Sequence, residues 1–144
     1  MDGLHKFPRL DHAIGQIQEH CLGRSQNPEE EASAAVAMFG RLVSVLFPVL
    51  GQAGSLALFR RSLHLTDQAF PCYQEMRIVE EGALLNTVES YLRRHPQIAR
   101  DAATALLKNF VELLATFVGE GLTRQLLQDA WPAIVSVKPE ETPQ

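Results

Sequence analysis

The fold of this chain is decided by residues 97–131, which read QIARDAATALLKNFVELLATFVGEGLTRQLLQDAW. Apolar residues recur here at spacings of three and four, which is the pattern of one broad apolar helix face. They are Ala103, Leu106, Leu107, Phe110, Leu113, Leu114, Phe117 and Val118. Only Gly119-Glu120-Gly121 interrupts the pattern. A helix with so wide an apolar face needs partner helices to cover it, so we expect an all-α bundle.

Length and composition limit the number of domains and the kinds of partner that this chain can have. The 144 residues, of which 46% are hydrophobic, suffice for one domain with its own core. We expect a single helical-bundle domain over residues 1–135 and a disordered tail over residues 136–144, where prolines are common and little can be buried. The net charge of −4 offers no basic surface to a phosphate backbone, so nucleic-acid binding is not expected.

Turn and cap signals in the rest of the chain divide it into helices. The clearest is Asn27-Pro28, followed by three glutamates, because Asn caps a helix, Pro suits its first position and acidic side chains favour its positive end. The expected helices span residues 8–22, 28–47, 52–65, 83–94, 96–118 and 122–130. We therefore predict five or six helices, with the second and fifth at the centre.

Residues 42–59 contain no charged side chain, which raises the question of a membrane span. Pro48 and Gly51 lie in the middle of this stretch, and Arg41 and Arg60 flank it on both sides. We interpret it as two core helices joined at a Pro/Gly break, and we expect no association with a membrane.

The two cysteines, Cys21 and Cys72, lie far apart and form no CxxC pair, so a disulfide framework is not expected. The first eight residues lack the basic start and apolar run of a secretion signal, which favours a cytoplasmic location. His12 and His20 lie about 12 Å apart along one helix, too far to share a metal ion without other ligands. No cofactor, metal or catalytic residue is predicted.

Two regions are candidates for recognition. The segment Phe70-Pro71-Cys72-Tyr73 brings aromatic side chains to a predicted loop, although such a loop often folds back onto its own bundle. Trp131, the only tryptophan, either plugs the end of the bundle or anchors an interface. The candidate interface residues are Phe70, Cys72, Tyr73, Glu120, Thr123 and Trp131.

The segment GEGLTRQLLQDAWP, residues 119–132, resembles the closing motif of a group of short bacterial helical proteins. In that group a long apolar helix runs into Gly-Glu-x-Leu-Thr and ends at Trp-Pro. Residues 58–63 also resemble proteins of that group, but more loosely. The resemblance implies a bacterial cytoplasmic protein in which Gly119, Glu120, Thr123 and Trp131 form a structural or interface unit. Glu120 with Thr123 would cap the last helix.

These patterns favour a non-enzymatic protein-interaction or regulatory module. The helices have wider apolar faces than a small bundle covers, which predicts a homodimer or a protein partner. The alternative is a protein that binds a small apolar ligand inside the bundle, where small residues leave a cavity. The small residues are Ala32, Ala34, Ala35, Ala37 and Gly40. An enzyme is the third hypothesis.

Overall fold

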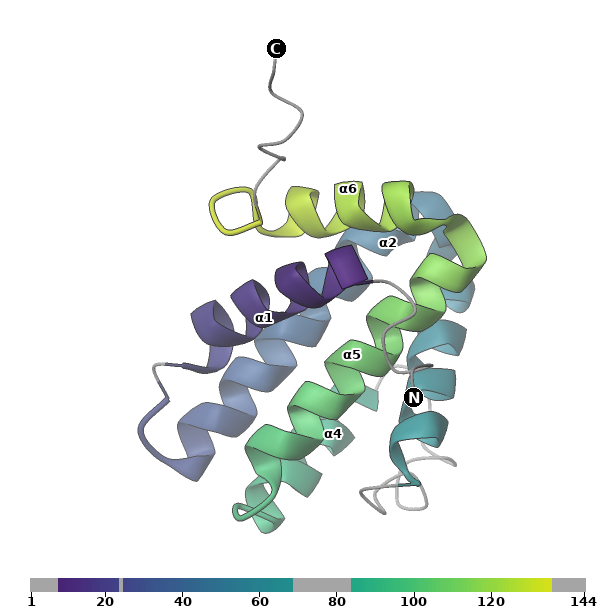
Figure 1. Ribbon diagram of the computed structural model, residues 1–144. Coiled ribbons are helices and arrows are strands. Elements are labelled where there is room, and N and C mark those ends of the chain that lie inside the picture. Colours follow the sequence, from purple (N-terminus) through teal and green to yellow (C-terminus); the bar gives the residue numbers. More distant parts are fainter. Residues whose placement is uncertain (1–7, 24, 69–83, 136–144) are drawn as a thin grey trace.

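The computed structural model describes residues 8–23, 25–68 and 84–135 (Figure 1). All elements in these ranges are helical, which confirms the predicted all-α bundle. They are α1 (Pro8–Leu22), α2 (Pro28–Thr66), α4 (Leu84–Arg94), α5 (Ala99–Val118) and α6 (Glu120–Ala130). The predicted tail of residues 136–144 lies outside the described residues.

The start of α2 follows from its cap. Asn27 has an extended backbone, with φ −153° and ψ 166°, and its Oδ1 accepts the N–H of Glu30 at 2.9 Å. Glu30 in turn accepts the N–H of Gln26 at 2.8 Å. Two backbone N–H groups at the helix start are thus paired reciprocally, in the manner of a capping box. The predicted start at Pro28 is confirmed.

The predicted Pro/Gly break lies at Gly51 within α2. The helix continues through Pro48, and only Gly51 leaves helical geometry, with φ 78° and ψ 167°. The prediction of a stop or kink at Pro48 was therefore wrong in position by one turn. Proline removes one hydrogen bond, whereas this backbone conformation is accessible almost only to glycine and reverses the chain direction. The two segments of α2 correspond to two of the predicted helices.

The core lies where α2 and α5 meet, and both helices pack against each of the other described helices. Three fully buried phenylalanines hold this centre together. The ring centroid of Phe59 is 5.5 Å from that of Phe39 and 5.7 Å from that of Phe110. Each of the two α2 segments and α5 supplies one ring, so this cluster joins both segments of α2 to α5. The predicted central position of these helices is confirmed.

The face that α5 buries differs from the predicted one at its end. Ala103, Leu106, Phe110 and Leu114 are buried as expected, whereas Phe117 is 67% exposed. The last turn of α5 extends beyond the part of the helix that its neighbours cover. The periodicity located the apolar face correctly but overestimated how far along the helix it is covered.

Two arginines connect the ends of helices to neighbouring helices through hydrogen bonds. Nη2 of Arg100 donates to the carbonyl of Leu22 at 2.7 Å, and its Nε lies 2.7 Å from Oε2 of Glu31. Nε of Arg41 donates to the carbonyl of Ala130 at 2.7 Å. A cation at a helix C-terminus pairs a free carbonyl and favours the negative end of the helix dipole. Arg100 thereby ties α1 to α2 and α5, and Arg41 ties α6 to α2.

Candidate functional site

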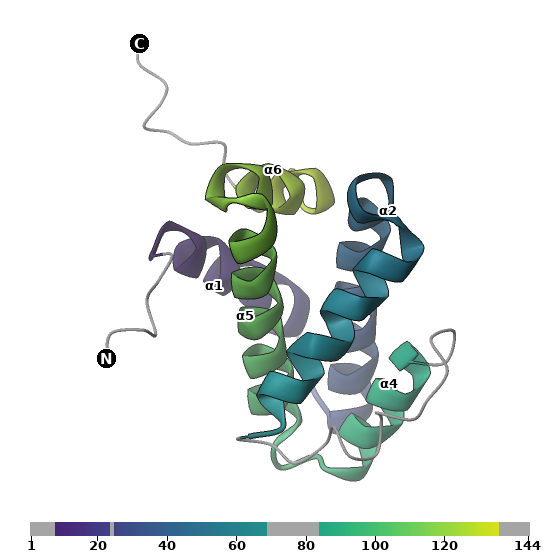
Figure 2. The same ribbon diagram turned by 90° about the vertical axis from the view of Figure 1, so that its right-hand side faces the viewer.

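The structure separates the predicted recognition residues. Glu120 and Thr123 lie in the first turn of α6, and Trp131 follows its last residue. The helix α6 lies across one end of the bundle, so these residues are at opposite ends of the same helix (Figures 1 and 2). Phe70, Cys72 and Tyr73 lie outside the described residues. Glu120 and Thr123 are thus separated from Trp131 by the length of α6, and their predicted role as one interface unit stays a prediction.

The predicted cap of α6 by Glu120 and Thr123 was wrong. Gly119 occupies the cap position, with φ 95°, and no side chain caps the helix. Thr123 is fully buried and its Oγ1 donates to the carbonyl of Gly119 at 2.7 Å. A hydroxyl one turn inside a helix reaches back to the carbonyl four residues earlier, so it satisfies an acceptor rather than the free N–H groups. Glycine makes the corner by its own backbone freedom.

A cluster of exposed apolar side chains lies at the two glycine corners of the bundle. Among the described residues the exposed large hydrophobic side chains are Phe47, Val49, Phe117 and Leu122, with exposed fractions of 42%, 43%, 67% and 41%. Each lies within four residues of Gly51 or Gly119, the two glycines with positive φ. Both corners are at the same end of the bundle, which is the top in Figures 1 and 2. We call these four residues the apolar end.

The chain around the apolar end is nearly free of charge. Residues 42–59 and 113–119 contain no charged side chain, and Glu120 beside them is half-buried. The described stretch Glu29–Thr66 is long and apolar enough to cross a membrane by length and composition, with a hydropathy of 1.9 in its most apolar window. Core helices of soluble proteins pass the same test, but only 33% of that window is buried here. An uncharged apolar surface of this kind excludes water when a partner covers it.

At the other end of α6, Trp131 is 5% exposed and fills the space beside α1. Its indole N–H donates to the sulfur of Cys21, a half-buried free thiol. Burial raises the pKa of this thiol, although the hydrogen bond from Trp131 and the charge of Arg41 act in the opposite direction. The thiol is therefore neutral at neutral pH, and it is a packing and hydrogen-bonding group rather than an activated nucleophile.

A depression of about 360 Å³ opens beside Trp131 and Cys21. Ala34, Ala37 and Arg41 of α2 form its other side. The small residues that predicted an interior cavity thus divide between two environments. Ala32 and Ala35 are buried in the core, whereas Ala34 and Ala37 line this surface depression.

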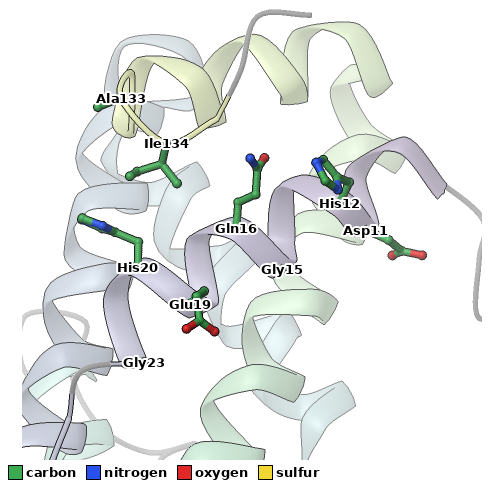
Figure 3. Close-up of a pocket in the computed structure, with 9 residues that line it drawn as sticks. All are labelled: Asp11, His12, Gly15, Gln16, Glu19, His20, Gly23, Ala133 and Ile134. Atoms are coloured by element: carbon green, nitrogen blue, oxygen red, sulfur yellow. The ribbon is translucent and has the colours of Figure 1, made fainter. Parts of the chain in front are cut away.

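A second depression, of about 750 Å³, runs along the outer face of α1 and shares His20 with the first (Figure 3). Asp11, His12 and Glu19 also line it, and Ile134 closes one side. Figure 3 shows His12 and His20 at different ends of this face, as the predicted separation requires. Among the described residues, no three His, Cys, Asp or Glu side chains are arranged to hold a metal ion.

One interior cavity lined by described residues is small. It lies among Phe39, Thr66, Tyr91 and Leu106 and has a volume of about 10 Å³. Such a volume admits at most one water molecule. This cavity does not hold a small organic ligand, so the depressions at the surface are the better candidates for ligand binding.

Arg41, which lines the depression beside Trp131, is the candidate binding residue that sequence reasoning missed. It is the only charged residue between Glu31 and Arg60, in the middle of an otherwise apolar helical stretch. That isolation was the available signal, because a lone charge in an apolar helix usually has a specific partner. Its position beside Trp131 depends on the packing of α6 against α2.

Comparison with known proteins adds no family to these observations. No protein-family model matches the chain, and neither a curated protein nor a solved structure matches it at a significant level. The resemblance of residues 119–132 to a bacterial group stays a prediction.

Proposed function

We propose that this chain is a non-enzymatic protein-interaction module whose docking surface is the apolar end. The observation that carries the proposal is the location of the exposed large hydrophobic side chains. Phe47, Val49, Phe117 and Leu122 all gather at the two glycine corners instead of being scattered over the described surface. Single exposed apolar residues are ordinary, whereas a larger group of them on one part of the surface is typical of an interaction site.

The partner we propose is a second copy of the chain, which makes the protein a homodimer. A two-fold symmetric contact places the same residues of both copies opposite each other. A charged surface opposes such pairing by like-charge repulsion, whereas residues 42–59 and 113–119 carry no charge. Self-association through the apolar end therefore brings no charged side chain of these segments against its own copy.

The expected dimer is weak. Completing the burial of four half-exposed apolar side chains contributes roughly 3–5 kcal/mol per copy. Association costs on the order of 4–15 kcal/mol in lost translational and rotational freedom. The gain summed over both copies and this cost are similar in size, so we expect a dimer no tighter than high micromolar, which dissociates on dilution.

Sedimentation equilibrium over a wide range of concentration tests this proposal. Phe117→Glu introduces a charge at the most exposed apolar position and is expected to give a monomer at every concentration. Asn86→Glu adds the same charge at an exposed site on α4 and is expected to dimerise like the natural chain. Circular dichroism of both variants establishes that the helices are retained.

Three results would contradict the proposal. A natural chain that stays monomeric up to millimolar concentration excludes the homodimer. Equal dimerisation of Phe117→Glu and the natural chain excludes the apolar end as the contact. Cosedimentation of the natural chain, but not of Phe117→Glu, with neutral phosphatidylcholine vesicles assigns the surface to a membrane instead.

A further inference from the structure

We propose that the depression beside Trp131 binds a small organic carboxylate, with the guanidinium of Arg41 pairing the carboxylate and Trp131, Met38 and Ala37 contacting its apolar body. The proposal is independent of the apolar end, because Trp131 lies at the opposite end of α6. The volume of about 360 Å³ falls within the range of roughly 300–1,000 Å³ that small-molecule sites occupy.

The guanidinium of Arg41 is held in place by a hydrogen bond from its Nε, and its Nη groups are available to a ligand. Its Nε donates to the carbonyl of Ala130 at 2.7 Å, which fixes the plane of the group. Among the described residues no carboxylate pairs with Arg41, so its two Nη groups remain for an external acceptor. A planar guanidinium with two free N–H edges matches the geometry of a carboxylate.

The charges around the depression favour an anion. The described lining contains Arg41 and the ring of His20, and no Asp or Glu. The thiol of Cys21 is neutral and already accepts a hydrogen bond from Trp131. The negative end of the α6 dipole offsets roughly half of the charge of Arg41, which leaves a net positive site of modest strength. The neighbouring depression, in contrast, contains Asp11 and Glu19.

The rest of the lining selects a ligand with an apolar body. Ala34, Ala37, Met38 and Trp131 surround the single cation with apolar side chains. Inorganic phosphate would find one guanidinium and few further donors in this lining. A carboxylate attached to an aromatic or short aliphatic group uses both the charge and the apolar wall. Because the depression is open to solvent, we expect binding in the millimolar range.

Trp131 provides a selective probe, since it is the only tryptophan of the chain and gives a single indole N–H signal in a ¹H–¹⁵N NMR spectrum. Phenylacetate is titrated and followed through this signal, with phenylacetamide as its neutral counterpart and inorganic phosphate as a second anion. We expect phenylacetate to shift the signal saturably, and both other compounds to bind about tenfold more weakly or not at all.

Two variants localise the binding. Ala37→Leu fills the depression without altering its charge and is expected to weaken phenylacetate binding at least about tenfold. Arg41→Gln removes the cation and is expected to have a similar effect. Ala57→Leu, at another exposed alanine of α2, is the matched control and is expected to bind within about twofold of the natural chain. Ala37→Leu keeps the bond from Arg41 to Ala130, so it tests the site even where Arg41→Gln impairs folding.

The proposal is overturned by any of four results. They are no shift at tens of millimolar phenylacetate, equal binding of phenylacetamide, tighter binding of phosphate, and unchanged binding by Ala37→Leu. Equal binding of the amide would show an apolar site without use of Arg41, and tighter binding of phosphate would show an inorganic-anion site.

Discussion

Replacing Phe59 by alanine is expected to lower the free energy of unfolding of the bundle by about 3–5 kcal/mol. Phe59 is completely buried and contacts both Phe39 and Phe110, at centroid distances of 5.5 and 5.7 Å. Truncation of a buried phenylalanine costs about 3–5 kcal/mol through lost burial and the cavity it leaves. That loss includes the two ring pairs, each worth roughly 0.5–1.5 kcal/mol. Domains of this size have a total stability of about 5–15 kcal/mol, so the expected loss is a large fraction of the total.

The same substitution at Phe117 is the matched control, because this side chain is 67% exposed on α5. Phe117→Ala is expected to change the free energy of unfolding by less than about 0.5 kcal/mol. Urea titrations followed by Trp131 fluorescence and by helical circular dichroism measure both variants. The titrations are run at low micromolar concentration, where self-association contributes little to stability.

Equal losses from Phe59→Ala and Phe117→Ala would refute this account of the core, and so would a loss below about 1.5 kcal/mol from Phe59→Ala. Where Phe59→Ala does not fold at all, Phe59→Leu provides a milder change with a measurable transition. A smaller loss from Phe59→Leu than from Phe59→Ala is required if packed volume at this position sets the stability.

Two further predictions concern the corner before α6 and an ion pair between helices. Gly119→Ala places a side chain on a residue with φ 95° and is expected to lower the free energy of unfolding by about 1–3 kcal/mol. Gly121 is at a helical position with nothing within 4 Å of an added Cβ, so Gly121→Ala is expected to raise the free energy of unfolding by about 0.5–1 kcal/mol. Thermal unfolding measures both variants. Burial lowers the pKa of Lys108, but hydrogen bonds and charges from Glu112 and Asp11 outweigh it and raise the pKa above 10.5. The protonated form is thus favoured by folding, so the stabilisation is complete at neutral pH and is lost as pH rises through the raised pKa. Urea titrations of the natural chain and of Lys108→Met are expected to differ by less than about 1 kcal/mol at pH 8 and to converge at high pH.

The predictions for the glycine corner and for Lys108 can each be contradicted by a specific result. Equal effects of the two glycine substitutions would show that backbone geometry does not distinguish the positions. A stability difference between the natural chain and Lys108→Met that grows with rising pH would show that the lysine charge is unfavourable in the folded state.

Several helix boundaries were predictable to within three residues because the signals that set them act within one turn of the chain. Asn27 satisfies an N–H three residues away, and Gly51 and Gly119 supply backbone angles that other residues rarely adopt. The error at Pro48 has the same origin. Pro48 and Gly51 both disfavour a helix and lie within one turn of each other. The local sequence does not show which of the two ends the helix.

The candidate sites depended on contacts that no local signal contains. Arg41 pairs with Ala130 although they are far apart in sequence, and Arg41 and Trp131 line the same depression. The exposure of Phe117 depends on where the neighbouring helices stop covering α5.

The sequence alone was sufficient to show that this protein is helical, where several of its described helices begin or end to within a few residues, and which side of each helix is apolar. These properties follow from backbone geometry and side-chain periodicity within a few residues. Only the tertiary structure decided which part of each apolar face is covered and which distant side chains meet. Burial and pairing depend on the approach of whole helices, because packing is set by the shapes of both partners and not by the periodicity of either one.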